Sequence, residues 1–170
     1  MVLAEISLCE QAMRDSEEQL ARWHADDDIV HKLDEVSGIG LLTASALKTA
    51  VGKPERFASG RHLSAWLGMT PNEYSSGERR RLGCISCKGN TYVRTLLIHG
   101  ARAALLAAKR CQTRTPERLT QLQRWALQTA ERIGHNKAAV ALANKLVRIC
   151  WAVWCHERRF SGDWQSARPA

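Results

Sequence analysis

The protein has 170 residues, a length that fits one domain with a real core, and 45% of its residues are hydrophobic. This composition excludes a chain that is disordered throughout. No uncharged apolar run reaches the roughly 18 residues that a membrane span needs, and the N-terminus has no basic region followed by an apolar stretch. The sequence therefore predicts a cytoplasmic protein without a membrane partner.

The charge is distributed unevenly along the chain. The first 35 residues carry ten acids and three bases, whereas the remainder carries 22 bases and seven acids. The overall net charge of +8 therefore understates how basic the main body is. A body this basic indicates a polyanionic partner, and nucleic acid fits best. A membrane surface fits less well, because the arginines are not gathered on one helix opposite an apolar face.

Residues 2–24 have the pattern of an amphipathic helix. Its apolar side chains recur near helical spacing, with acids between them: Val2, Leu3, Ile6, Cys9, Met13 and Leu20. Such a helix needs a partner to cover its apolar stripe, so it is either an N-terminal arm or the last turns of a coiled coil. A homo-oligomer formed through this helix is one expectation. The carboxylates of residues 26–28 follow, and they favour a helix start over a metal site.

A glycine-containing turn between two helical patterns resembles a helix-hairpin-helix. Gly38 and Gly40 flank Ile39, and a helix rich in small residues resumes at Leu41. The glycines permit a tight turn, and free N–H groups at the start of the second helix can hold a phosphate. The alternative is an ordinary turn between two helices. In this basic chain we expect the phosphate-facing hairpin.

Residues 74–83, YSSGERRRLG, form the segment richest in chemical groups. Ser75, Ser76 and Gly77 precede three consecutive arginines: Arg79, Arg80 and Arg81. Glycine allows the backbone to approach a ligand closely, and arginine offers paired donors that match phosphate oxygens. A serine held beside these arginines can be positioned against a phosphodiester. A solvated loop whose charges only aid solubility is the alternative.

The elements around this loop are expected to be helical. Residues 59–69 read as a short helix with Trp66 turned inward, and the loop itself is expected to close as a small hairpin with Gly77 at its tip. The inward side chains of that hairpin would be Leu82, Cys84 and Ile85. A strong helix follows over residues 91–109, introduced by Lys88 and Asn90. Arg94 in its first turn does not complement the helix dipole, which suggests that it meets an anion, whereas His99 is expected in the core.

Two further helices are expected over residues 116–133 and 137–156, and the second has the broadest apolar face. Residues 158–170 are expected to form a mobile tail. The six cysteines include one C-x-x-C pair, Cys84 and Cys87, but no second pair at similar spacing completes a zinc site. Reduced, buried thiols are therefore the default expectation, with a small zinc protein as an alternative.

The ordered motifs resemble the C-terminal domain of a family of bacterial insertion-sequence transposases, known as the one-ten, one-sixteen or nine-oh-two type. The resemblance rests on GIGLLTASAL, on FASGRHLSAWLGMTPNEYSSGERRRLGCISCKGNTYVRTLLIHGARAAL and on NKAAVALANKLVRICWAV, and it covers residues 30–157. Members of this family are serine recombinases guided by a bridge RNA.

The resemblance implies DNA and a guide RNA as partners and Ser76 as the nucleophile that attacks a DNA phosphate, with Ser75 ranked second. The expected nucleic-acid-binding residues are Gly38, Gly40, Arg79, Arg80, Arg81, Lys88, Asn90 and Arg94. Full-length members begin with a RuvC-like domain whose four acids hold Mg²⁺, and this sequence has no room for that domain. No cofactor or metal is therefore expected in this chain.

The sequence thus predicts an all-α fold: a compact helical domain with a helix-hairpin-helix-like turn, an irregular serine/arginine loop and an N-terminal helical arm. Residues 1–30 are assigned to the remnant of a coiled coil, 31–157 to the serine domain and 158–170 to the tail. The chain is expected to be a truncated transposase that contributes half of an active site. A non-catalytic module that binds DNA or RNA, or regulates a full-length transposase, is the alternative function.

Overall fold

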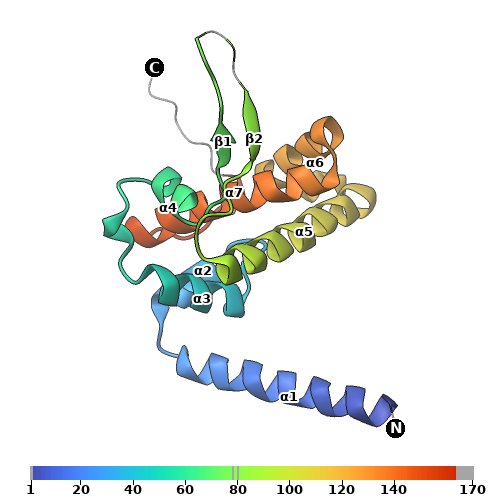
Figure 1. Ribbon diagram of the computed structural model, residues 1–170. Coiled ribbons are helices and arrows are strands. Elements are labelled where there is room, and N and C mark those ends of the chain that lie inside the picture. The colour runs from blue at the N-terminus through green and yellow to red at the C-terminus, as the bar shows by residue number, and fades with distance from the viewer. Residues whose placement is uncertain (1, 78, 80, 164–170) are drawn as a thin grey trace.

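Seven α-helices and one two-stranded sheet make up the part of the chain that the computed structural model describes, residues 2–77, 79 and 81–163 (Figure 1). The helices are α1 (Val2–Trp23), α2 (Asp28–Asp34), α3 (Leu41–Val51), α4 (Gly60–Trp66), α5 (Thr91–Arg114), α6 (Gln121–Ile133) and α7 (His135–Cys155). The strands are β1 (Pro71–Glu73) and β2 (Leu82–Ile85). The predicted, mostly α-helical fold is confirmed.

Helix α7 lies at the centre of the core and packs against α2, α4, α5 and α6. Its buried side chains recur along one broad face and include Leu142, Leu146 and Cys150. Helix α5 packs closely on it through Leu97, Ala101 and other small or branched residues. By length and composition alone α7 could also span a membrane, but half of its apolar stretch is buried inside this core.

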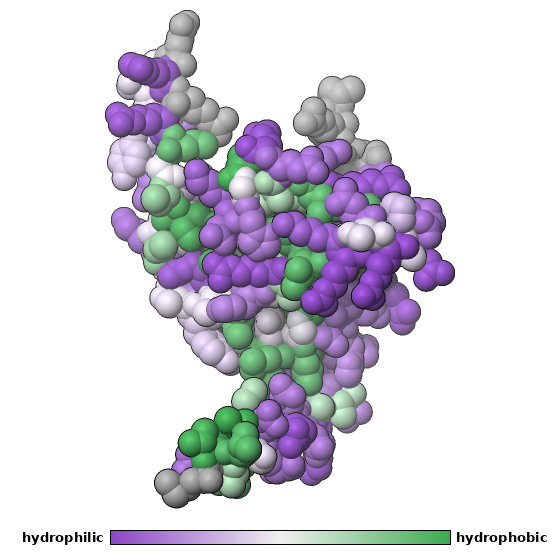
Figure 2. Space-filling view, turned by 90° about the vertical axis from the view of Figure 1, so that its right-hand side faces the viewer, coloured by the Kyte–Doolittle hydropathy of each residue, from purple (hydrophilic) through white to green (hydrophobic). Residues whose placement is uncertain are grey.

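Helix α1 projects from the body as a separate arm (Figure 1). None of its residues is buried, and its apolar stripe is exposed to solvent. Figure 2 shows a hydrophobic patch at the free end of this arm, where Val2, Leu3 and Ile6 lie. The predicted N-terminal helical arm is confirmed, and its stripe has no partner among the described residues.

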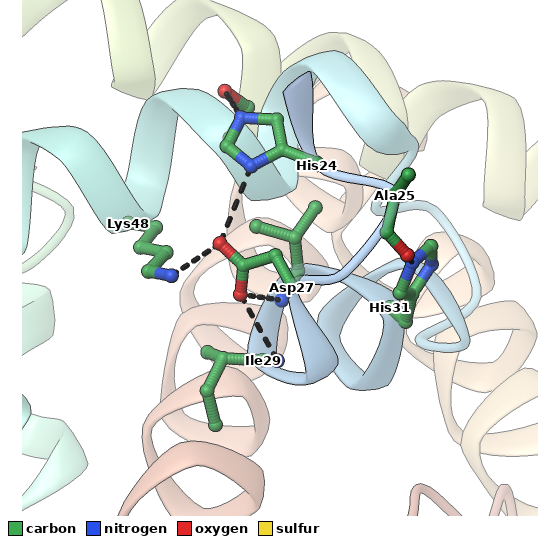
Figure 3. A network of polar contacts seen from close by, with 8 residues as sticks. His24, Ala25, Asp27, Ile29, His31 and Lys48 are labelled. Carbon is green, nitrogen blue, oxygen red and sulfur yellow. Dashed lines mark hydrogen bonds and ion pairs between the residues drawn. The ribbon is translucent and has the colours of Figure 1, made fainter. Parts of the chain in front are cut away.

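A polar network fixes the point where the arm joins the body (Figure 3). The Asp27 carboxylate caps α2 by accepting from the backbone N–H groups of Ile29 and Val30, both at 3.2 Å. It also pairs with Lys48 of α3 and with Nδ1 of His24, the latter at 3.3 Å. The Nε2 atom of His24 in turn lies 2.8 Å from the Ser45 hydroxyl. The acidic run therefore starts a helix, as predicted.

Several expectations about individual segments were wrong. Residues 116–133 do not form one helix, because the Thr120 hydroxyl and the Gln123 side chain make a reciprocal capping box that starts α6 after a short 3-10 turn, η2 (Pro116–Arg118). His99 is exposed on α5 and does not lie in the core.

The first part of the tail, which was expected to be mobile, is hydrogen-bonded to the start of α6. The carbonyl of Gly162 accepts from the N–H of Leu122 at 3.1 Å, and the Asp163 carboxylate accepts from that of Gln121 at 3.0 Å. Residues 164–170 lie outside the described part of the chain.

Candidate functional site

The serine/arginine segment forms a hairpin that stands away from the helical body (Figure 1). Strands β1 and β2 pair antiparallel, with Pro71 opposite Ile85 and Glu73 opposite Leu82. The ladder continues to the tip, where Ser76 and Arg79 exchange backbone hydrogen bonds of 3.1 and 3.3 Å. Gly77 between them has a φ of +55°, which glycine adopts without strain. The expected hairpin with Gly77 at its tip is therefore present.

The hairpin does not bury the side chains that the sequence suggested. Leu82 is 48% exposed, Cys84 is exposed and Ile85 is half-buried. Among the described residues the sheet has only these two strands, so no third strand covers the side chains of Leu82 and Cys84. The hairpin therefore presents its polar groups on an open surface.

The two serines have different surroundings. The Ser75 hydroxyl donates to Oε1 of Glu73 at 2.7 Å and accepts from the backbone N–H of Arg81 at 3.1 Å. The bond from Arg81 joins the two sides of the hairpin, so Ser75 has a structural role. Ser76 is exposed at the turn, and among the described residues its hydroxyl makes no hydrogen bond.

Two described arginines, Arg79 and Arg81, follow this turn on the returning side of the hairpin. Arg79 lies directly opposite Ser76 in the ladder, and the carbonyl of Arg81 accepts from the N–H of Tyr74 at 2.8 Å. Both arginines are exposed, and neither forms an ion pair with another described residue. Arg80, the third predicted contact, lies outside the described residues. Chemically, the tip offers an unengaged hydroxyl beside free cations.

The predicted contacts below the hairpin fall into two groups. Lys88 is exposed in the loop that leads from β2 to α5. Asn90 and Arg94 instead perform structural work. The Asn90 carboxamide oxygen caps α5 by accepting from the N–H of Val93 at 3.1 Å.

The Arg94 side chain is buried, with only 8% of its surface exposed. Its Nη1 donates to the carbonyl of Leu67 and its Nη2 to the Thr91 hydroxyl, both at 3.2 Å. The sequence analysis expected Arg94 to meet an anion, but its partner is the backbone carbonyl of Leu67, just past the end of α4. Burial and two internal bonds leave this guanidinium turned away from a ligand at the surface.

The two glycines of the turn between α2 and α3 have different surroundings. Gly38 has a φ of +92° and packs against α5, where an added Cβ would lie 2.9 Å from the Cβ of Ala104. Gly40 is exposed at the start of α3, where no side chain caps the helix. Packing therefore accounts for Gly38, and the helix start at Gly40 is the part of this turn that is open to a ligand.

The cysteines do not form a metal centre in the described part of the chain, where no three His, Cys, Asp or Glu side chains gather. Cys84 and Cys87 are exposed, contrary to the expectation of buried thiols. Cys150 is buried, and burial raises the pKa of its thiol to about 12. The acids of residues 26–28 do not fit a magnesium site either, because Asp27 is committed to Lys48 and the α2 cap.

Sequence reasoning missed the partners of Asp27. The capping role was visible because aspartate precedes a short helix, but Lys48, which pairs with Asp27, is 21 positions further along. No local pattern links such positions. The only signal in the sequence is that the mostly apolar helix α3 carries the polar residues Ser45 and Lys48.

Comparison with known proteins places these features in a family. The sequence model described as the Transposase IS116/IS110/IS902 family matches residues 30–117. The chain is 40% identical over 153 residues to a probable family 20 transposase of Pseudomonas aeruginosa, covering 90% of this chain and 43% of that protein. It is 36% identical over 151 residues to the transposase for insertion sequence element IS1111A of Coxiella burnetii, covering 89% and 40%.

A third relative is the transposase for insertion sequence element IS1328 of Yersinia enterocolitica. It is 35% identical over 154 residues, covering 91% of this chain and 44% of that protein. The chain thus spans about two fifths of the length of these curated relatives. The matches to the family model and to these relatives extend over the glycine turn, the serine hairpin and α5. The chain belongs to the IS116/IS110/IS902 transposase family.

Proposed function

We propose that this chain is a DNA-binding transposase domain in which the Ser76 hydroxyl attacks a DNA phosphate during strand cleavage and rejoining. The observation that carries the proposal is the difference between the two serines. Ser75 is held by Glu73 and Arg81, whereas the exposed Ser76 hydroxyl is unbonded among the described residues. A nucleophile must be free to meet its substrate, so the geometry favours Ser76.

The reaction is a transesterification. The Ser76 Oγ forms a bond to phosphorus, the bond from phosphorus to one deoxyribose oxygen breaks, and the serine proton passes to that leaving oxygen. The resulting phosphoserine diester keeps the energy of the broken bond, and attack by a DNA hydroxyl reverses the step. No high-energy cofactor is consumed.

The cations of the hairpin fit the role of phosphate holders. Arg79 lies opposite Ser76, and Arg81 and Lys88 lie further down the same hairpin and its exit loop. Guanidinium groups stay protonated, so they do not remove the serine proton. They can neutralise the attacked phosphate and stabilise charge that develops in the transition state. The start of α3 at Gly40, which no side chain caps, is a further proposed nucleic-acid contact. A guide RNA is the second proposed nucleic-acid partner, beside DNA.

The proposal is tested by trapping the covalent intermediate. The chain is mixed with a nicked suicide DNA and with the portion of a full-length relative that this chain does not span. We expect a protein–DNA adduct that survives denaturation and maps to Ser76 by mass spectrometry. Ser76→Ala abolishes it, whereas the matched control Ser75→Ala retains it at a lower level because the hairpin loosens. Absence of an adduct under these conditions would reject catalysis.

A second function is supported by a separate observation. Among the described residues, no histidine or carboxylate side chain makes a hydrogen bond to Ser76 that would activate it. A non-catalytic module that binds DNA or RNA, and competes with a full-length transposase, agrees with this. It predicts salt-sensitive binding that falls in Arg79→Ala and Arg81→Ala, is unchanged in Ser76→Ala, and gives no adduct.

A further inference from the structure

Exposed aromatic side chains are concentrated in the part of the sequence that contains the serine hairpin. Among the described residues, the exposed large aromatics are Trp23 on the arm, Trp66, Tyr74 and Tyr92. The last three fall within 27 residues of the chain that also contain Ser76, and they include both tyrosines of the protein. Single exposed apolar side chains are common on protein surfaces and indicate nothing alone. This concentration in one basic segment requires a further reason.

The ring of Tyr74 is held in a defined place on the hairpin. It is 67% exposed, yet its Cε2 lies 3.0 Å from the position that a Cβ on Gly83 would occupy. The ring therefore lies closely over the glycine of the opposite strand. A ring fixed in this way loses little conformational entropy when a second flat group stacks on it.

The ring of Trp66 lies at the last turn of α4, where the hairpin is attached. It is 44% exposed and packs on Phe57 with ring centroids 5.5 Å apart. The backbone of Gly89 rests against the carbonyl of Trp66, so closely that a side chain at Gly89 would overlap it. Lys88 precedes that glycine and is exposed, and its backbone packs against Gly68 just after α4.

The attachment of the hairpin to α4 is rigid. The N–H groups of Ser86 and Cys87 donate to the carbonyls of Thr70 and Gly68 at 2.8 and 3.3 Å. Arg94 binds the carbonyl of Leu67 from the other side. The start of α5, which carries Tyr92 with 57% exposure, is thereby joined to the same point. These bonds hold all three rings in one structural unit with the serine turn.

From this arrangement we infer that Trp66, Tyr74 and Tyr92 stack against unpaired bases of a single DNA strand whose backbone is held by Arg79, Arg81 and Lys88. Exposed aromatic rings interleaved with cations suit an unpaired strand, because each base offers a flat face and each phosphate a charge. A duplex presents no free base faces. The inference rests on the proposed function in taking DNA as the partner, and it adds that the strand at the hairpin is unpaired.

The experiment measures binding of a 20-nucleotide single strand, its duplex and an abasic strand of equal length, each at two salt concentrations. For Trp66→Ala, Tyr74→Ala and Tyr92→Ala we expect affinity for the single strand to fall about fivefold to a hundredfold each, as loss of one stacked base predicts. The dependence of this affinity on salt concentration stays unchanged in these three variants. Lys88→Ala instead makes the salt dependence shallower, because one phosphate contact is lost.

Controls separate stacking from general damage. Trp23→Ala removes an aromatic ring of the arm that is 79% exposed, more than any of the three, and leaves binding unchanged. Trp66→Phe keeps a ring and retains most of the affinity, so a folding defect in Trp66→Ala does not decide the outcome. The wild-type protein binds the abasic strand more weakly than the normal one, and the aromatic variants lose no further affinity for it.

The inference would be overturned if the three aromatic variants lost affinity equally for duplex and single-stranded DNA, or lost no more affinity than Trp23→Ala. It would also be overturned if the rings contributed to binding of single-stranded RNA but not of single-stranded DNA. The proposed cleavage by Ser76 can be wrong independently of the stacking surface. If no Ser76 adduct forms but the ring-dependent preference for single strands remains, the proposed cleavage is wrong and the stacking surface stands. If the adduct forms and the three ring variants bind normally, only the stacking surface is wrong.

Discussion

The Nη1 atom of Arg94 donates a hydrogen bond of 3.2 Å to the carbonyl of Leu67, which lies 27 positions earlier in the chain. This bond joins the first turn of α5 to the end of α4, at the point where the serine hairpin is attached. A buried cation at this position also satisfies a carbonyl that α4 leaves without a helical partner. The pair therefore fixes the base of the candidate active site.

Replacing Arg94 by methionine is expected to lower the free energy of unfolding by about 2–3 kcal/mol, because a buried carbonyl loses a charged donor. Denaturant unfolding followed by circular dichroism measures the loss. Arg81→Met, which removes an exposed arginine of the hairpin, is the matched control and leaves stability within about 0.5 kcal/mol. Equal stabilities for the two variants would show that Arg94 has no structural role.

The same bond shows how far sequence reasoning reaches here. The cation in the first turn of α5 is a local anomaly that led us to expect an anion, whereas its partner is a backbone carbonyl of the same chain. The partner could not be named, because Leu67 belongs to another helix and only tertiary packing brings it close. The long periodic helices α5 and α7 followed from apolar spacing, which is a local property.

The outward-facing side chains were harder to predict. Trp66 and Leu82 were expected to point inward because apolar residues usually do, yet they are 44% and 48% exposed. Nothing in their local pattern distinguishes a ring that packs in a core from one at a surface that binds a ligand. The choice between Ser75 and Ser76 came from the resemblance to a family and stays a prediction, and local sequence could not show that Ser75 bonds to Glu73 and Arg81.

The close approach of the glycine turn to α5 gives a second prediction. A side chain at Gly100 would overlap the carbonyl oxygen of Gly38, and both groups belong to backbone that packing holds in place. Gly100→Ala should therefore lower the free energy of unfolding by about 1–3 kcal/mol, as overpacking of a core does. Thermal and denaturant melts measure it.

Gly40→Ala is the control for that substitution, because nothing lies within 4 Å of an added Cβ and the φ of −93° suits alanine. It should change stability by less than about 1 kcal/mol, since only the helix-capping preference of glycine is lost. If Gly100→Ala were tolerated as well as Gly40→Ala, the turn would not rest on α5 as described.

The Asp27 network predicts a specific loss of stability in acid. Burial by itself would raise the pKa of this carboxyl, but the Lys48 ammonium, the Val30 N–H and the His24 ring together lower it from 3.8 to about 2. A group whose folded pKa is depressed contributes stability above its unfolded pKa. That contribution is lost as the pH falls from about 4 towards 2. Screening of the partly exposed Lys48 limits it to roughly 1 kcal/mol.

The measurement is urea unfolding of the wild-type protein and Lys48→Met at pH 6 and at pH 2.5. We expect Lys48→Met to be less stable by about 1 kcal/mol at pH 6, with the gap largely closed at pH 2.5. Lys53→Met, which removes an exposed lysine without an ion pair among the described residues, should track the wild-type protein at both values. A gap for Lys48→Met that is constant with pH would separate Lys48 from the titration of Asp27.

The exposed stripe of α1 predicts self-association. Its members follow one another at alternating steps of four and three residues: Val2, Ile6, Cys9, Met13, Ser16 and Leu20. This is the spacing of a coiled-coil seam, and α1 buries none of these side chains against its own chain. A second copy of the helix is the partner that such a stripe fits, so sedimentation should show a dimer that dissociates on dilution.

Ile6→Lys and Met13→Lys together should shift the protein to the monomer, because two charges then face the seam. Leu8→Lys is the matched control: this leucine is 71% exposed on the opposite side of α1, so its replacement should leave the dimer intact. Equal effects of both changes would point to non-specific adhesion of exposed apolar groups. Since α1 contributes nothing to the core, both variants should retain the unfolding transition of the helical body, and a shift in oligomeric state can be read directly.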